Sequence, residues 1–124
     1  MATLRELNTH KDFRGSLTVV EGEYDVPFEI KRIYYIYDVE HSASRGGHRH
    51  IKTSQALICL RSQCTVFVDD GKTQQTYVLN DPAICLILQP EDWHTMENFT
   101  DETVLLVLAS EHFDAEDYVD EGYT

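Results

Sequence analysis

Two histidines, His48 and His50, stand two residues apart directly after a pair of glycines. Residues two apart on a β-strand project from the same face, so the two imidazoles would enter the same space. Histidine has an ordinary pKa near neutrality, and a pair of imidazoles can act as base and acid or can bind a metal ion. The alternative is two exposed histidines on an edge strand.

Positive charge near this pair would suit an anionic ligand. Arg45 precedes the two glycines, and its planar guanidinium has five donors that match a phosphate. The chain as a whole has 124 residues and a formal net charge of −12, which argues against nucleic-acid binding. An anion must therefore meet a local cluster of basic residues. The candidates are Arg14, Lys31, Arg32, Arg45, Arg49 and Lys52.

A third imidazole, His94, lies between a proline and an asparagine. This stretch resembles the second short motif of the cupins, and the glycines with the histidine pair resemble the first. Gln55 stands where the first motif usually supplies a glutamate ligand. Facial metal sites usually include a carboxylate, so we expect no metal. The alternative is a metal-dependent cupin, for example a dioxygenase, with ligands His48, His50 and His94.

Short runs of β-branched and aromatic residues, separated by turn residues, cover most of the chain. No run keeps the spacing of an amphipathic helix, so the pattern predicts an all-β barrel or jelly roll in a single domain, residues 1–124. Asp70-Gly71 is the clearest hairpin turn. The predicted strands lie near residues 16–21, 30–38, 47–50, 54–60, 64–69, 74–79, 84–88, 93–97 and 103–109.

The apolar run from Thr103 to Ala109 has no polar alternation, as expected for a strand covered on both faces. In so small a barrel this predicts a dimer interface. The acidic residues 111–121 predict a solvated turn or tail.

The sequence also bears on the compartment. We find no secretory signal and no membrane-spanning run, and we expect a cytoplasmic protein that does not bind a membrane. Cys59, Cys64 and Cys85 lie in apolar runs without zinc-binding spacing, so they should be buried free thiols.

Beyond these motifs, nearly the whole chain resembles the sugar 3,4-ketoisomerases of thymidine-diphosphate (TDP) sugar pathways, a family grouped with the WxcM-like proteins. The matching segments are residues 12–17, 27–37, 45–50, 55–60, 69–71, 104–110 and 117–118. The resemblance implies a cupin-type double-stranded β-helix, a homodimer and no cofactor. It also implies conversion of dTDP-4-keto-6-deoxy-D-glucose to a 3-keto isomer, for the 3-amino-3,6-dideoxyhexoses of surface polysaccharides such as the O-antigen of lipopolysaccharide.

The resemblance also suggests roles for individual residues. We expect His50 to be the base at C3, His48 to relay the proton, and Tyr35 to stabilise the enediolate. Tyr37 shares the face of Tyr35 and is assigned to the same pocket. The remaining predicted substrate-binding residues are Arg32 and Arg45 at the pyrophosphate, Trp93 or a tyrosine on thymine, Gln55 on a sugar hydroxyl, and Arg14 and His94 around C4.

Two other functions remain open at this stage. A small β-barrel can bind a sugar without reacting, which would make the chain a sensor or binding module. A 3,5-epimerase of the same sugar nucleotides also removes a proton beside the 4-ketone, although the motif around the histidine pair fits the ketoisomerases better.

Overall fold

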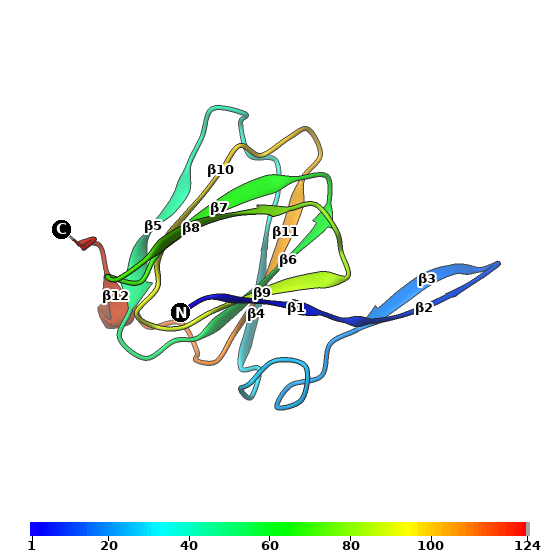
Figure 1. Cartoon of the computed structure of the whole chain (residues 1–124), viewed down its shortest axis with the longest axis horizontal. Coiled ribbons are helices and arrows are strands. Elements are labelled where there is room, and N and C mark those ends of the chain that lie inside the picture. Colours follow the sequence, from blue (N-terminus) through cyan, green and yellow to red (C-terminus); the bar gives the residue numbers. More distant parts are fainter. Residues whose placement is uncertain (124) are drawn as a thin grey trace.

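The computed structural model describes residues 1–123 and contains two five-stranded antiparallel sheets that face each other (Figure 1). The first sheet has the order β1 (Thr3–Glu6), β9 (Ile84–Leu88), β6 (Gln55–Arg61), β11 (Val104–Ala109) and β4 (Arg32–Ile36). The second has the order β12 (Tyr118–Val119), β5 (Arg45–His50), β10 (Trp93–Glu97), β7 (Cys64–Asp69) and β8 (Gln74–Leu79). The predicted all-β jelly roll of cupin type is confirmed.

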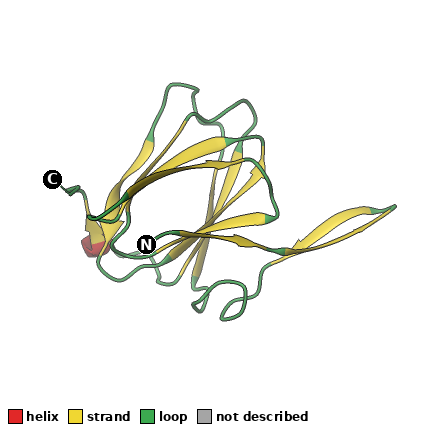
Figure 2. Ribbon diagram, viewed as in Figure 1, coloured by secondary structure: helices red, strands yellow, loops and turns green. Residues whose placement is uncertain are grey.

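Strands dominate the described residues, and one short 3-10 helix, η1 (Ala115–Asp117), precedes β12 (Figure 2). All nine predicted strands have counterparts. The sequence missed β1, β2 (Asn8–Asp12) and β12, which are short or rich in polar residues. No helix within residues 1–123 is long and apolar enough to cross a membrane.

The core lies between the two sheets. Leu57, Leu105 and Val107 project from the first sheet, and Val66 and Met96 project from the second. Their neighbours along each strand point to the other face, as the two-residue period requires. Burying one such side chain contributes about 1.5–3 kcal/mol, so the facing sheets form a stable frame for the site.

The outer face of the first sheet is covered by the loop before β4. Val26 is fully buried and Phe28 packs in the same cluster, against Ile58 and Leu108. The apolar run of β11 is therefore covered on both faces by its own chain. This run therefore needs no second copy of the chain to cover it, and the homodimer stays a prediction.

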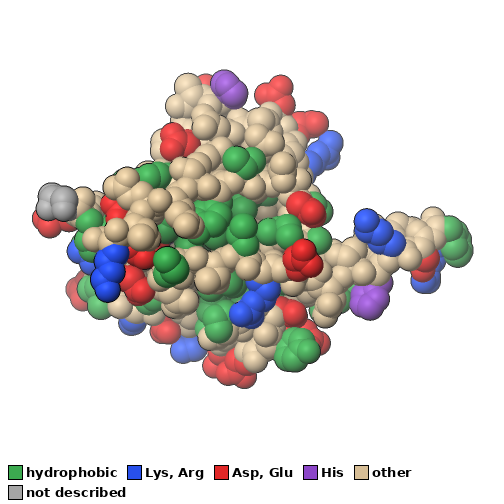
Figure 3. Space-filling model, in the orientation of Figure 1, with side chains coloured by type: hydrophobic (Ala, Val, Ile, Leu, Met, Phe, Trp, Pro, Cys, Tyr) green, Lys and Arg blue, Asp and Glu red, His purple; other side chains and the backbone are tan. Residues whose placement is uncertain are grey.

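A hairpin, β2 and β3 (Gly15–Val19), projects from the barrel as an arm (Figure 1). Among the described residues, its strands pair only with each other. Phe13 at the turn is 97% exposed, and Leu17 is also exposed. The space-filling view shows a hydrophobic side chain at the end of the arm, while other hydrophobic side chains gather between the sheets (Figure 3).

The acidic C-terminal segment at residues 111–121 was predicted to be a solvated turn or tail, and its side chains other than that of Asp117 are exposed or half-buried, but the segment is anchored to the barrel. β12 pairs with β5, and Trp93 donates its indole N–H to the carbonyl of Asp120 at 3.1 Å. Tyr123 donates its hydroxyl to the carbonyl of Glu91 at 2.6 Å. The segment is thus fixed across one end of the second sheet. The three cysteines are buried and free, as predicted.

Candidate active site

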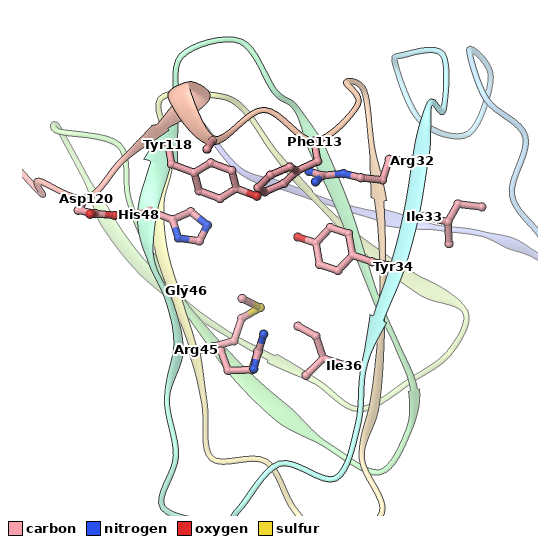
Figure 4. A pocket seen from close by; sticks show the side chains of 12 residues that line it. Arg32, Ile33, Tyr34, Ile36, Arg45, Gly46, His48, Phe113, Tyr118 and Asp120 are labelled. Atoms are coloured by element: carbon pink, nitrogen blue, oxygen red, sulfur yellow. The ribbon is translucent and has the colours of Figure 1, made fainter.

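A cavity of about 590 Å³ lies between the sheets, at the end covered by the C-terminal segment (Figure 4). Strand β4 forms one wall, and β5 with Met96 of β10 forms the other. Figure 4 shows Phe113 and Tyr118 reaching across the opening between the two walls. The residues around the cavity are Arg32, Ile33, Tyr34, Ile36, Arg45, Gly46, His48, Met96, Phe113, Ala115, Tyr118 and Asp120.

A bulge in β5 sets the direction of the histidine pair. His48 pairs with His94 and Gly46 pairs with Thr95, so Gly47 is an extra residue between two paired positions. Gly46 and Gly47 have φ of +84° and +80°, which side chains with a Cβ rarely adopt. The glycines of the motif therefore bend the strand and turn His48 into the cavity.

The three imidazoles lie in one cluster. The ring of His48 is 5.2 Å from that of His50 and 5.2 Å from that of His94, centroid to centroid. His48 lines the cavity, whereas His50 is only 3% exposed and lies against the ring of Tyr118 at 4.7 Å. Burial lowers the pKa of His48 and of His50. Both are therefore neutral at pH 7.

His50 is held by Asp117. Its Nδ1 lies 2.9 Å from Oδ2 of Asp117, and both side chains are buried. Its other ring nitrogen, Nε2, is buried without a hydrogen-bond partner within residues 1–123. Such an arrangement leaves one nitrogen with a lone pair for a proton from a ligand.

His94 is the most deeply buried of the three histidines. It is 1% exposed, and its Nδ1 lies 3.0 Å from the carbonyl oxygen of Asp92, to which it donates. Burial lowers its pKa to about 4. His94 therefore stays neutral and adds no positive charge beside His48 and His50.

Tyr34 faces His48 across the cavity (Figure 4). Its hydroxyl accepts a hydrogen bond from Nε2 of Gln55 at 2.8 Å, and burial raises its pKa to about 12. It therefore remains a phenol and keeps its own proton for donation. The guanidinium of Arg32 lies 5.2 Å above its ring.

A comparison with known proteins identifies the family. The family described as "FdtA: WxcM-like, C-terminal" matches residues 1–123. The TDP-4-oxo-6-deoxy-alpha-D-glucose-3,4-oxoisomerase of Aneurinibacillus thermoaerophilus is 44% identical over 108 residues, which are 87% of this chain and 78% of the relative. The chain belongs to the FdtA, WxcM-like family.

Solved structures of 3,4-ketoisomerases resemble the barrel closely. A histidine-to-asparagine variant of QdtA from Thermoanaerobacterium thermosaccharolyticum, in complex with TDP-4-keto-6-deoxyglucose, has a TM-score of 0.93 at 39% identity, covering 97% of this chain and 87% of the other. The WlaRB TDP-quinovose 3,4-ketoisomerase of Campylobacter jejuni has a TM-score of 0.93 at 39% identity, covering 97% and 92%.

In this member of the FdtA family, five of the predicted site residues lie together. His48, Arg32 and Arg45 line the cavity, His50 lies directly behind His48, and His94 lies in the same cluster. Gln55 reaches the cavity through Tyr34. Their assigned roles stay predictions.

The structure does not place Tyr35 and Tyr37 in the cavity. They are 62% and 59% exposed and stack on each other at 5.9 Å on the outer face of β4. Because side chains alternate along a strand, the inward face of β4 carries Arg32, Tyr34 and Ile36. Arg32 was predicted to bind the ligand, so the alternation of side chains already implied that Tyr34 faces the ligand too. This signal was missed.

Trp93 and Arg14 also lie outside the cavity of their own chain, and their roles stay predictions. Trp93 alternates with His94 and points outward, where Gly122 lies against its indole. Arg14 sits at the turn of the arm and binds Asp12, outside the cavity of its own chain. Sequence reasoning missed Phe113, Asp117 and Tyr118, although the matching segment at residues 117–118 pointed toward the last two.

A metal site finds little support among the described side chains. Within residues 1–123, no group of three or more His, Cys, Asp or Glu side chains is arranged to hold a metal ion. Gln55 uses its amide to bind Tyr34. The absence of a metal cofactor remains a prediction.

Proposed function

We propose that this enzyme is a TDP-4-keto-6-deoxyglucose 3,4-ketoisomerase. The observation that carries the proposal is the pair of His48 and His50 beside a cavity walled by Tyr34 and two arginines. The oxoisomerase of A. thermoaerophilus and the QdtA complex with the 4-keto sugar support it. A non-reacting sugar module would not require two neutral imidazoles at one cavity.

The reaction needs only proton transfers. The ketone at C4 acidifies the proton on C3, and His50 removes it through Nε2 to form an enediolate. The hydroxyl proton on the C3 oxygen then moves to the C4 oxygen, which leaves the negative charge on the C3 oxygen. Return of a proton to C4 gives a ketone at C3 and a hydroxyl at C4, and His48 is placed to carry this proton.

Tyr34 takes the role that we first gave to Tyr35. Negative charge develops on the two oxygens of the enediolate, and a preorganised donor lowers the energy of that intermediate. A phenol whose pKa is about 12 donates without losing its proton at pH 7. The bond from Gln55 fixes the hydroxyl and leaves its proton free for the substrate.

Arg32 and Arg45 would bind the pyrophosphate. Nε of Arg32 is buried and lacks a hydrogen-bond partner within residues 1–123, so a ligand oxygen would satisfy it. The rings of Phe113 and Tyr118 at the cavity opening are better placed than Trp93 to stack on thymine.

We expect the purified protein to convert TDP-4-keto-6-deoxyglucose to its 3-keto isomer without added metal and in the presence of a chelator. The proposed steps use only side chains of the protein, so removal of divalent ions should leave the rate unchanged. NMR of the product distinguishes the 3-keto isomer from a 3,5-epimer. Loss of activity on chelation, restored by a metal, would favour the metal-dependent alternative.

The pathway and compartment follow from the same proposal. A 3-keto sugar is the substrate that an aminotransferase needs to make a 3-amino-3,6-dideoxyhexose for a surface polysaccharide such as the O-antigen of lipopolysaccharide. Three buried free thiols suit the reducing cytoplasm.

We also propose that the enzyme is a homodimer. The arm exposes Phe13 and Leu17, and the outer face of β4 exposes Ile33, Tyr35 and Tyr37. In a two-fold dimer, these exposed apolar surfaces of one copy would be covered by the same surfaces of the second copy. This also gives the two outward tyrosines an apolar partner.

Light scattering should therefore give about twice the chain mass of 14.3 kDa. Phe13→Ser together with Leu17→Ser should lower the mass toward that of one chain, because the arm loses its apolar contacts. Tyr24→Ser, an exposed aromatic residue outside the arm, is the matched control. A monomeric wild type would refute the dimer.

A further inference from the structure

Asp117 is a buried carboxylate with four hydrogen bonds. Oδ1 accepts from the backbone N–H of Ile51 at 3.1 Å and of Lys52 at 2.8 Å. Oδ2 accepts from the hydroxyl of Thr53 and lies 2.9 Å from Nδ1 of His50. All of these donors come from the few residues at the end of β5, whereas Asp117 ends η1 in the C-terminal segment.

This environment keeps Asp117 ionised at pH 7. Burial opposes the charge, but the bonds from Thr53, from the amide of Lys52 and from His50 outweigh it and lower the pKa of the carboxyl. An ionised carboxylate only accepts hydrogen bonds. Nδ1 of His50 must therefore carry the proton, and Nε2 must carry the lone pair.

We propose that Asp117 is a positioning residue that holds His50 in the tautomer with Nε2 free to accept the C3 proton. The inference rests on the proposed ketoisomerase function. It explains why Nε2 is the buried atom without a partner, while Nδ1 is held. A carboxylate behind a catalytic imidazole also stabilises the imidazolium that forms when the base accepts a proton.

The charged and titratable groups that face His50 agree with this assignment. His48 on the same strand and His94 on β10 are neutral at pH 7. Tyr118 packs on the ring, and Arg32 of β4 lowers the pKa of His50. Asp117 is the group that raises that pKa, so it is the nearby negative charge available to a protonated His50.

The test is Asp117→Asn. The amide oxygen can still accept from the backbone of residues 51 and 52, so the chain connection is kept. The amide N–H₂ then faces Nδ1 and donates to it, which forces the proton of His50 to Nε2. A base with a proton on its reacting nitrogen cannot accept another.

We expect kcat to fall by about a hundredfold or more, within the range for loss of a general base, with little change in KM. The acid limb of the pH profile should move to lower pH, because the residual active molecules lose the charge that raises the pKa of His50. Nitrogen-15 NMR should show Nδ1 protonated in the wild type and Nε2 protonated in the variant.

Asp114→Asn is the matched control, since it removes one negative charge from the same segment while an asparagine still caps η1. It should keep the activity, the pH profile and the tautomer. A wild-type His50 with its proton on Nε2 would overturn the inference, and this measurement does not depend on folding of the variant. An active wild type with an equally active Asp117→Asn variant would also overturn it, whereas an inactive wild type would instead refute the proposed function.

Discussion

His50→Asn is expected to lower turnover by about two to four orders of magnitude, the usual span for loss of a general base. Asparagine has no group that accepts a proton near neutral pH, so removal of the C3 proton should fail. Its amide can still donate to Asp117, which keeps the link between β5 and the C-terminal segment. NMR of product formation measures the loss.

Exchange in heavy water tests the same step separately. The wild type should exchange the C3 proton of the substrate with solvent, and His50→Asn should not, because exchange reports proton removal even when return at C4 fails. His48→Asn should also impair turnover, to a smaller extent. His41→Asn, at an exposed histidine outside the cavity, serves as control. If His50→Asn exchanges C3 at the wild-type rate, His50 is not the base and His48 must take its place.

Burial changes what we expect for stability. His50 is 3% exposed and bonded to Asp117, so it does not lie at a solvent-reachable mouth of the barrel. His50→Asn should therefore cost about 1 kcal/mol of unfolding free energy through a weaker buried hydrogen bond. Rates should be compared per folded molecule.

Strand composition predicted the all-β fold, and motif spacing predicted that His48 and His50 lie together. The alternating runs gave the two sheets, and His48 and His50 could be paired because a two-residue period needs no tertiary information. The glycines of the motif were also informative, since they mark the bulge that aims His48.

The choice between Tyr34 and Tyr35 required information from outside these two neighbouring residues. A strand with aromatic residues at consecutive positions has two plausible inward faces, and a residue already assigned to the cavity, such as Arg32, or a contact from another strand decides between them. Gln55 on β6 makes that contact with Tyr34.

Asp117 was missed for a similar reason. Acidic composition predicts solvent exposure, but this carboxylate is stabilised by donors from residues 50–53, more than 60 positions away in sequence. Local charge cannot reveal a partner that the fold brings from so far.

Gly46→Ala should have the second large effect, on both stability and rate. At φ of +84° an added Cβ would lie 2.9 Å from the carbonyl oxygen of His94. That carbonyl belongs to β10, which pairs with a strand on each side and cannot move freely. Backbone strain and overlap together should lower the unfolding free energy by about 2–5 kcal/mol.

Gly47→Ala is the matched control, because its φ is +80° but nothing lies within 4 Å of an added Cβ. Gly47→Ala has the conformational strain without the overlap, so it should lower the unfolding free energy by about 1–2 kcal/mol. The strand shift in Gly46→Ala also displaces His48 from its position opposite His94, and an error of about 1 Å at a catalytic group can cost a hundredfold in rate. Urea unfolding and the rate per folded molecule measure the two effects. Equal losses for the two alanine variants would show that the close approach of β5 to β10 at Gly46 does not position His48.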